Sequence, residues 1–165
     1  MNLVRVLIAD DECIIREALC DVLDADPRFE VVGLASSAEE LRARAEMLRP
    51  DVVLVDVRMP GGGEAAARAV LTLPTPDVDR IGTRAAPPVV VAVSGHTGPA
   101  VVAAMLRAGV SGYLAKGSLG HLPDMVARCA HGEVVLAVPG AVDALREVMG
   151  GAVEAAPAAL RQAQS

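Results

Sequence analysis

Residues 51–60 read Asp-Val-Val-Leu-Val-Asp-Val-Arg-Met-Pro, an apolar run of strand length that ends at Asp56. Continuously apolar runs, without alternation, are typical of parallel strands that are covered on both faces. Similar runs occur at 3–9, 31–35, 89–93 and 112–115, and they alternate with helical patterns at 12–23, between Ser37 and Pro50, and at 64–72, 98–108 and 121–130. This alternation predicts an α/β protein with a parallel sheet and helices on both faces.

The composition limits the classes of function. The chain has 165 residues, 53% hydrophobic and 22% charged, which is typical of one globular domain with a short appendage. The net charge of -6 disfavours binding to a phosphate backbone, so we expect no direct DNA binding. No apolar run reaches the roughly 18 to 20 residues that span a bilayer, and the N-terminus lacks the features of a signal peptide. We therefore expect a cytoplasmic protein without membrane contact.

Polar residues follow the predicted strands where they end: Asp10, Asp11, Asp56, Ser94 and Lys116. Ligands of open α/β sheets bind at the carboxyl ends of the strands. Three carboxylates in one place repel one another unless a cation shares the site, and Mg2+ prefers such oxygen ligands. Mg2+, the Lys116 ammonium and the Ser94 hydroxyl can together bind the three outer oxygens of a phosphoryl group. Asp56 would be the nucleophile that attacks this group.

Four stretches carry a resemblance to a known family: residues 6–12, 51–60, 93–96 and 109–117. In this order and spacing they resemble the receiver domain of bacterial two-component response regulators. The run Gly-Tyr-Leu-Ala-Lys-Gly-Ser at 112–118 is similar to the NarL-like subfamily. The resemblance implies a flavodoxin-like (CheY-like) fold, a five-stranded parallel sheet of order 2-1-3-4-5 with helices on both faces.

The resemblance also implies a role for each site residue. Asp56 matches the phosphoacceptor and Lys116 the lysine that pairs with the phosphoryl group. Mg2+ is held directly by Asp11, Asp56 and the backbone carbonyl of Arg58, and through water by Asp10. Ser94 matches the switch hydroxyl and Tyr113 the switch aromatic that moves inward behind it. The side chains of Arg58 and His96 flank the phosphoryl group and modulate the attack of water.

The expected function is that of a phosphoacceptor in a phosphorelay, not of an enzyme. A sensor histidine kinase or a phosphotransfer protein supplies the phosphoryl group, and a downstream protein or a second copy receives the signal. One alternative is a Mg2+-dependent phosphatase of the haloacid-dehalogenase type, which needs an acid where Arg58 stands. The other is a receiver-like module that does not accept phosphate.

The resemblance covers residues 1–132, which we predict to be the receiver domain. Residues 133–165 form a C-terminal extension, with a helix predicted over 141–149 and a mobile tail. This extension is too short for the helix-turn-helix module of transcriptional relatives, so we expect no DNA-binding output domain in this chain. The proline-rich stretch 73–88 is predicted to be a surface loop.

Overall fold

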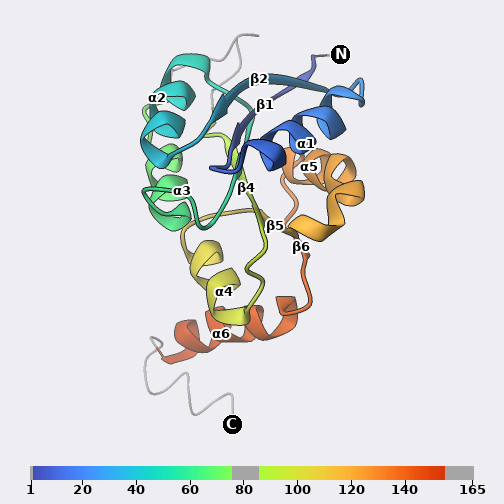
Figure 1. Cartoon of the computed structure of the whole chain (residues 1–165). Helices are drawn as coiled ribbons and strands as arrows, with labels where there is room; N and C mark the ends of the chain where they lie inside the picture. Colours follow the sequence, from blue (N-terminus) through green and yellow to red (C-terminus); the bar gives the residue numbers. More distant parts are fainter. Residues whose placement is uncertain (1, 76–85, 155–165) are drawn as a thin grey trace.

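The structure, a computed structural model, describes residues 2–75 and 86–154, with side chains up to residue 150. Within these residues one parallel sheet has the strand order β2-β1-β3-β4-β5-β6 (Figure 1). The strands are β1 (Val4–Ala9), β2 (Phe29–Ala35), β3 (Val52–Val55), β4 (Val89–Ser94), β5 (Gly112–Ala115) and β6 (Val135–Ala137). The helices are α1 (Cys13–Asp24), α2 (Ala38–Leu48), α3 (Gly63–Leu71), α4 (Pro99–Arg107), the 3-10 helix η1 (Lys116–His121), α5 (Leu122–Ala130) and α6 (Ala141–Glu154). The arrangement is a flavodoxin-like α/β fold.

The sheet has six strands, so the prediction of five is wrong in the number of strands. β6 extends the sheet beyond β5, and Tyr113 pairs there with Leu136. The Val135 amide also donates a hydrogen bond to the Ser111 carbonyl at 2.9 Å. A three-residue strand carries little pattern of its own, and the open edge of β5 supplies the hydrogen-bonding partners that form it. The helix expected over 141–149 is α6, which begins at Ala141 and continues to Glu154.

Helices cover both faces of the sheet, as Figure 1 shows. Alternate strand residues point to opposite faces, so each strand contributes to two apolar layers. On one face, Val6 and Ile8 of β1 pack in one cluster with buried side chains of α1 and α5. On the other face, Leu7 and Ala9 belong to a cluster that includes α2, α3 and α4. α6 packs against α4 and adds the fully buried Ala144 to this second cluster.

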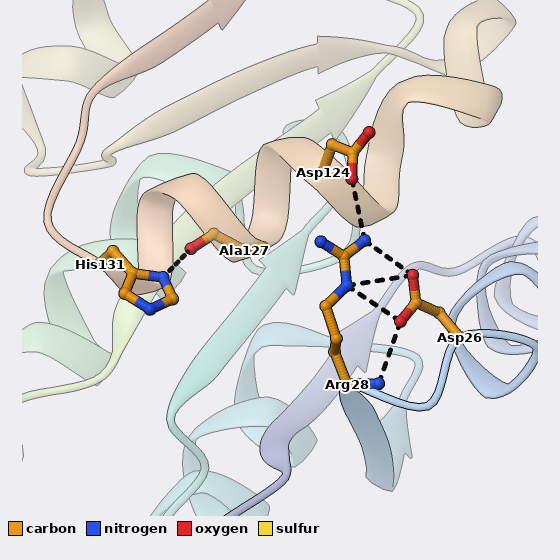
Figure 2. Close-up of polar contacts among 5 residues, drawn as sticks. All are labelled: Asp26, Arg28, Asp124, Ala127 and His131. Atoms are coloured by element: carbon orange, nitrogen blue, oxygen red, sulfur yellow. Dashed lines mark hydrogen bonds and ion pairs between the residues drawn. The ribbon is translucent and has the colours of Figure 1, made fainter. Parts of the chain in front are cut away.

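A polar network ties the turn before β2 to α5 (Figure 2). The Arg28 guanidinium contacts Asp26 at 2.7 Å and Asp124 of α5 at 2.9 Å. His131 at the end of α5 caps the helix through a contact of 2.6 Å between Nδ1 and the Ala127 carbonyl oxygen. Arg28 and Asp124 are exposed, so we expect their ion pair to contribute only a few tenths of a kcal/mol, up to about 1 kcal/mol. The network thus links the turn before β2 to the first turn of α5 with only a small contribution to stability.

The loop that follows β3 depends on three successive glycines. Gly61 and Gly62 have φ of 93° and 82°, in the left-handed region that side chains rarely adopt. At Gly63 a Cβ atom would lie 2.5 Å from the Val57 Cα and 2.8 Å from the Asp56 carbonyl oxygen. The start of α3 therefore lies directly against the backbone that carries Asp56. The run is a turn that is tightly packed at Gly61 and Gly63.

Replacing Gly63 with Ala is expected to lower the free energy of unfolding by about 1–3 kcal/mol, because both clashing neighbours are backbone atoms that cannot rotate away. Gly120→Ala is the matched control, since nothing lies within 4 Å of a Cβ at that position. Chemical denaturation of both variants measures the effect. Equal midpoints for the two variants would contradict the close approach.

Among the described residues, no helix is both long and apolar enough to cross a membrane. The proline-rich loop predicted over 73–88 lies partly outside the described residues, at 76–85. The predicted mobile tail also lies outside them from residue 155 onward.

Candidate functional site

Strand register brings the predicted site residues to one edge of the sheet. Ala9 of β1 pairs with Val55 of β3, so the next residues, Asp10 and Asp56, lie side by side. The Asp56 amide donates to the Ala9 carbonyl at 2.9 Å, which continues the ladder by one step. Across β4 and β5, Ser94 pairs with Ala115, so Lys116 emerges beside them. The carboxyl ends of four strands therefore supply one site, as the sequence predicted.

The acidic residues of the site form a tight cluster. Asp10, Asp11, Glu12 and Asp56 each place one carboxylate oxygen within 4.8 Å of the others. Asp10 and Asp56 are buried, whereas Asp11 and Glu12 are exposed at the mouth. The cluster opens into a pocket of about 310 Å³ that is lined by Asp11, Glu12, Asp56, Arg58, Gly95, His96 and Lys116. This pocket has room for a small anionic group next to a carboxylate.

Lys116 is the counter-charge of the cluster. Its ammonium nitrogen lies 2.9 Å from Asp10 Oδ2, 3.0 Å from Glu12 Oε1 and 3.5 Å from Asp56 Oδ2. Burial opposes the charged form, but the hydrogen bonds to Asp10 and Glu12 and the charge of Asp56 outweigh it, and the pKa of Lys116 lies above its usual value. The ammonium therefore stays protonated at neutral pH.

Asp10 is the most enclosed acid. Its side chain is fully buried, and its Oδ1 accepts a hydrogen bond of 2.9 Å from the Glu12 amide. Among the described residues, the ion pair with Lys116 is the only polar contact of Oδ2. The Arg16 guanidinium donates to the Asp10 carbonyl at 2.7 Å and ties α1 to the end of β1. A buried carboxylate held in this way depends strongly on its one cation.

Asp56 is 4% exposed. Burial raises the pKa of its carboxyl, the negative charge of Asp10 raises it further, and Lys116 and the Arg58 amide work in the opposite direction. The Arg58 amide contacts Asp56 Oδ1 at 3.4 Å. The charge of Asp56 is thus incompletely balanced by the protein, which favours a cation close by.

Ser94 and Tyr113 lie behind the pocket and do not line it. Both side chains are fully buried. The Ser94 hydroxyl accepts a hydrogen bond of 3.0 Å from the His96 amide, and the Tyr113 hydroxyl donates to the His96 carbonyl. Burial raises the pKa of the Tyr113 phenol, so this hydroxyl keeps its proton at neutral pH. The two residues hold the loop between β4 and α4, which carries His96 into the pocket.

Tyr113→Phe keeps the buried ring and removes the hydroxyl, so the His96 carbonyl loses its donor. We expect the free energy of unfolding to fall by about 1 kcal/mol. Tyr113→Ala removes the largest fully buried side chain, and a loss of about 3–5 kcal/mol is expected from the cavity. Urea denaturation of the two variants measures both effects. Equal losses would show that the hydroxyl, and not the ring, carries the contribution of this residue.

The donor set fits Mg2+. The cluster offers hard carboxylate oxygens at an open pocket, as a cation that keeps several waters requires. Two of these acids are buried with one lysine to balance them, which leaves negative charge for a metal to neutralise. The structure therefore brings together Asp11, Asp56, Arg58, His96 and Lys116 in the lining of the pocket. The buried Asp10 contacts Lys116 from behind the lining, and Ser94 and Tyr113 support the His96 loop.

Glu12 is a site residue that was missed in the sequence. It lines the pocket, belongs to the acidic cluster and contacts Lys116. The sequence feature that points to Glu12 as a site residue is its position directly after Asp10 and Asp11. The contact with Lys116 joins residues 104 positions apart, so it depends on the tertiary fold.

Fold and site together define an α/β protein with an acidic, lysine-containing pocket at the carboxyl ends of its parallel strands. The family model of the response regulator receiver domain matches residues 6–127, and the chain belongs to this family. Receiver domains are the phosphoacceptors of two-component signalling, and this role confirms the predicted function at the level of the family.

Two solved structures and one curated protein illustrate the similarity. Response regulator GacA from Pseudomonas viridiflava is 36% identical over 116 residues, which cover 70% of this chain and 50% of that protein. The signal receiver domain of a response regulator designated NarL from Mycobacterium tuberculosis has a TM-score of 0.71 and 31% identity, covering 81% of this chain and 100% of that one. A two-component response regulator of the LuxR family from Aurantimonas sp. SI85-9A1 has a TM-score of 0.72 and 25% identity, and the match covers 92% of this chain and 99% of that one. The chain spans half the length of GacA.

Proposed function

We propose that Asp56 is the phosphoacceptor of this chain. The observation that carries the proposal is its buried carboxylate, which faces the pocket 3.5 Å from the Lys116 ammonium. A carboxylate oxygen of Asp56 attacks the phosphorus of the donor and forms an acyl phosphate. The bond from phosphorus to the donor breaks, and its electron pair leaves with the donor. Lys116 stabilises the charge on the transferred oxygens.

Mg2+ is the proposed cofactor. Asp11, Asp56 and the backbone carbonyl of Arg58 would hold it directly, and Asp10 would hold it through water. When bound, the metal neutralises charge on the phosphoryl oxygens. Asp10 contributes by fixing Lys116 through their contact of 2.9 Å, which keeps the ammonium beside Asp56.

Ser94 and Tyr113 are the proposed switch residues. A phosphorylated Asp56 carries about 1.5 to 2 additional negative charges by analogy with other phosphorylated side chains. The Ser94 hydroxyl, now an acceptor for the His96 amide, would turn toward the new oxygens, and Tyr113 would follow the His96 loop. His96 and Arg58 line the pocket and would modulate the attack of water on the acyl phosphate. The response reaches α4 because this loop leads directly into it.

We propose that this protein is a member of the NarL-like subfamily, that it acts in the cytoplasm and that it is not itself an enzyme. Similarity to the NarL receiver supports the subfamily. The proposed partners are a sensor histidine kinase or phosphotransfer protein upstream, and a downstream protein or a second copy. Residues 1–132 are the proposed receiver and 133–165 its proposed C-terminal extension. α6 of this extension packs on α4, the helix that follows the His96 loop.

Labelling with a small phosphodonor tests the function. With Mg2+ and acetyl phosphate, the chain should gain one phosphoryl group that is labile to hydroxylamine. Borohydride, which reduces an acyl phosphate but not a carboxylate, should then mark the peptide that contains Asp56. Steady release of phosphate from a stable phosphate monoester would instead support the phosphatase alternative. Absence of any adduct would identify a module that does not accept phosphate.

A further inference from the structure

Lys116 has as many carboxylate neighbours as it has donors. An ammonium offers three N–H groups. Asp10 and Glu12 lie at hydrogen-bond distance, 2.9 and 3.0 Å, and Asp56 is more distant at 3.5 Å. A phosphoryl group on Asp56 would bring new acceptor oxygens to the same ammonium. Two of the three N–H groups are already directed to Asp10 and Glu12, so the phosphoryl oxygens can engage more than one N–H only if one of these two carboxylates is released.

Asp10 is poorly suited to release the ammonium. Its side chain is fully enclosed, and among the described residues Lys116 is the only polar contact of its Oδ2. Separation would leave the buried carboxylate without a cation in direct contact, since Mg2+ would reach Asp10 only through water, and this loss is strongly unfavourable. Asp10 therefore keeps its contact with Lys116 while the pocket changes.

Glu12 has the opposite properties. Its side chain is 62% exposed, so its carboxylate can exchange the ammonium for water at little cost. It also lines the pocket beside Asp56. The Glu12 amide stays bound to Asp10 Oδ1 at 2.9 Å, so the side chain can move away while the backbone remains in place.

We propose that Glu12 is a positioning residue that occupies the Lys116 ammonium in the unphosphorylated protein and is displaced by the incoming phosphoryl group. The inference rests on the proposed function of Asp56. Glu12 holds the ammonium at the mouth of the pocket, and it competes with the phosphoryl oxygens for the same donor. It thereby sets the affinity of the pocket for a phosphoryl group.

Titration with beryllofluoride, a stable mimic of the phosphoryl group, tests this competition at saturating Mg2+. Glu12→Gln removes the competing charge and keeps the size of the side chain, so binding should tighten about two- to fivefold. Glu17→Gln is the matched control, because it changes the net charge equally on the exposed surface of α1, where its carboxylate accepts from Cys13. This control should bind as the wild type does.

A spectroscopic readout reports the ammonium directly. Lys116 is the only lysine of the chain, so ¹⁵N-lysine labelling gives one side-chain ammonium signal. In the free protein this signal should shift in Glu12→Gln and stay unchanged in Glu17→Gln. With beryllofluoride bound, wild type and Glu12→Gln should give the same signal, since Glu12 has already been displaced.

The outcomes separate the two proposals. Equal tightening by both variants would show a general charge effect and overturn the role of Glu12. Weaker binding by Glu12→Gln, or two different bound-state signals, would also overturn it while leaving Asp56 as phosphoacceptor. Failure of the wild type to bind beryllofluoride would remove the proposed function, and this inference with it.

Discussion

Asp56→Asn is expected to abolish formation of the acyl phosphate while making the protein more stable at neutral pH. The amide is no longer a carboxylate nucleophile, so no phosphoryl adduct can form. Stability should rise because burial and the charge of Asp10 raise the pKa of Asp56 in the folded state. An ionised carboxyl with a raised folded-state pKa costs stability. The variant removes that cost.

The stability difference between Asp56→Asn and the wild type should depend on pH, because it comes from the ionised Asp56 carboxyl. The loss of stability caused by the ionised Asp56 is absent below the pKa of this carboxyl in the unfolded chain, because the carboxyl is then protonated in both the folded and the unfolded state. It develops as the pH rises through the folded-state pKa and is complete above it. The advantage of Asp56→Asn should therefore be present at pH 7 and disappear toward pH 3.

Mass spectrometry after treatment with acetyl phosphate and Mg2+ measures the adduct, and urea denaturation between pH 3 and 8 measures stability. Both are compared with Asp21→Asn, which replaces an exposed acid of α1 outside the pocket. An adduct on Asp56→Asn would place the phosphoacceptor elsewhere. A wild type that is more stable than Asp56→Asn at pH 7 would contradict the unbalanced charge of the pocket.

Lys116→Met is expected to lower the free energy of unfolding by about 3 kcal/mol or more at pH 7, because it leaves the buried Asp10 without its cation. The Asp56 carboxyl loses the nearby positive charge that lowers its pKa, so its protonation in the folded state becomes easier. The deficit should therefore grow as the pH rises and shrink at acid pH, where this acid is neutral in both states.

Two further variants show whether the effect comes from the buried pair. Asp10→Asn combined with Lys116→Met should recover part of the lost stability, since no uncompensated carboxylate remains at that position. Arg146→Met also removes one positive charge, but from an exposed ion pair with Asp143, and should change stability by less than about 1 kcal/mol. Thermal or urea denaturation of this series measures the differences. A double variant no more stable than Lys116→Met would contradict the assignment to Asp10.

The core of the fold could be predicted from the sequence because it is encoded locally. Apolar runs such as 52–55 are typical of parallel strands covered on both faces, and Asp56 follows directly at the strand end. Strand register then places Asp10 beside Asp56 without further information. For the same reason the strand ends predicted Asp11, Asp56 and Lys116 as site residues. Arg58 and His96 followed only from the family resemblance, and Glu12 was not predicted.

The features that could not be predicted depend on distant contacts. β6 exists because the edge of β5 pairs with it, and its three residues carry no pattern of their own. The close approach of Gly63 to Val57 results from the path of the loop, which composition does not define. The contact of Glu12 with Lys116 appears only when β1 and β5 end at the same edge. Burial of Ser94 and Tyr113 behind the pocket likewise follows from packing.

Tyr113 also makes the protein its own optical reporter. The chain has no tryptophan, one tyrosine and one weakly emitting phenylalanine, so emission excited in the tyrosine band originates from a single buried phenol. That phenol donates to the His96 carbonyl, on the loop that borders the pocket. Rearrangement of this loop would therefore change the emission intensity and its quenching by acrylamide. Occupancy of the pocket can thus be followed in real time on the unlabelled protein.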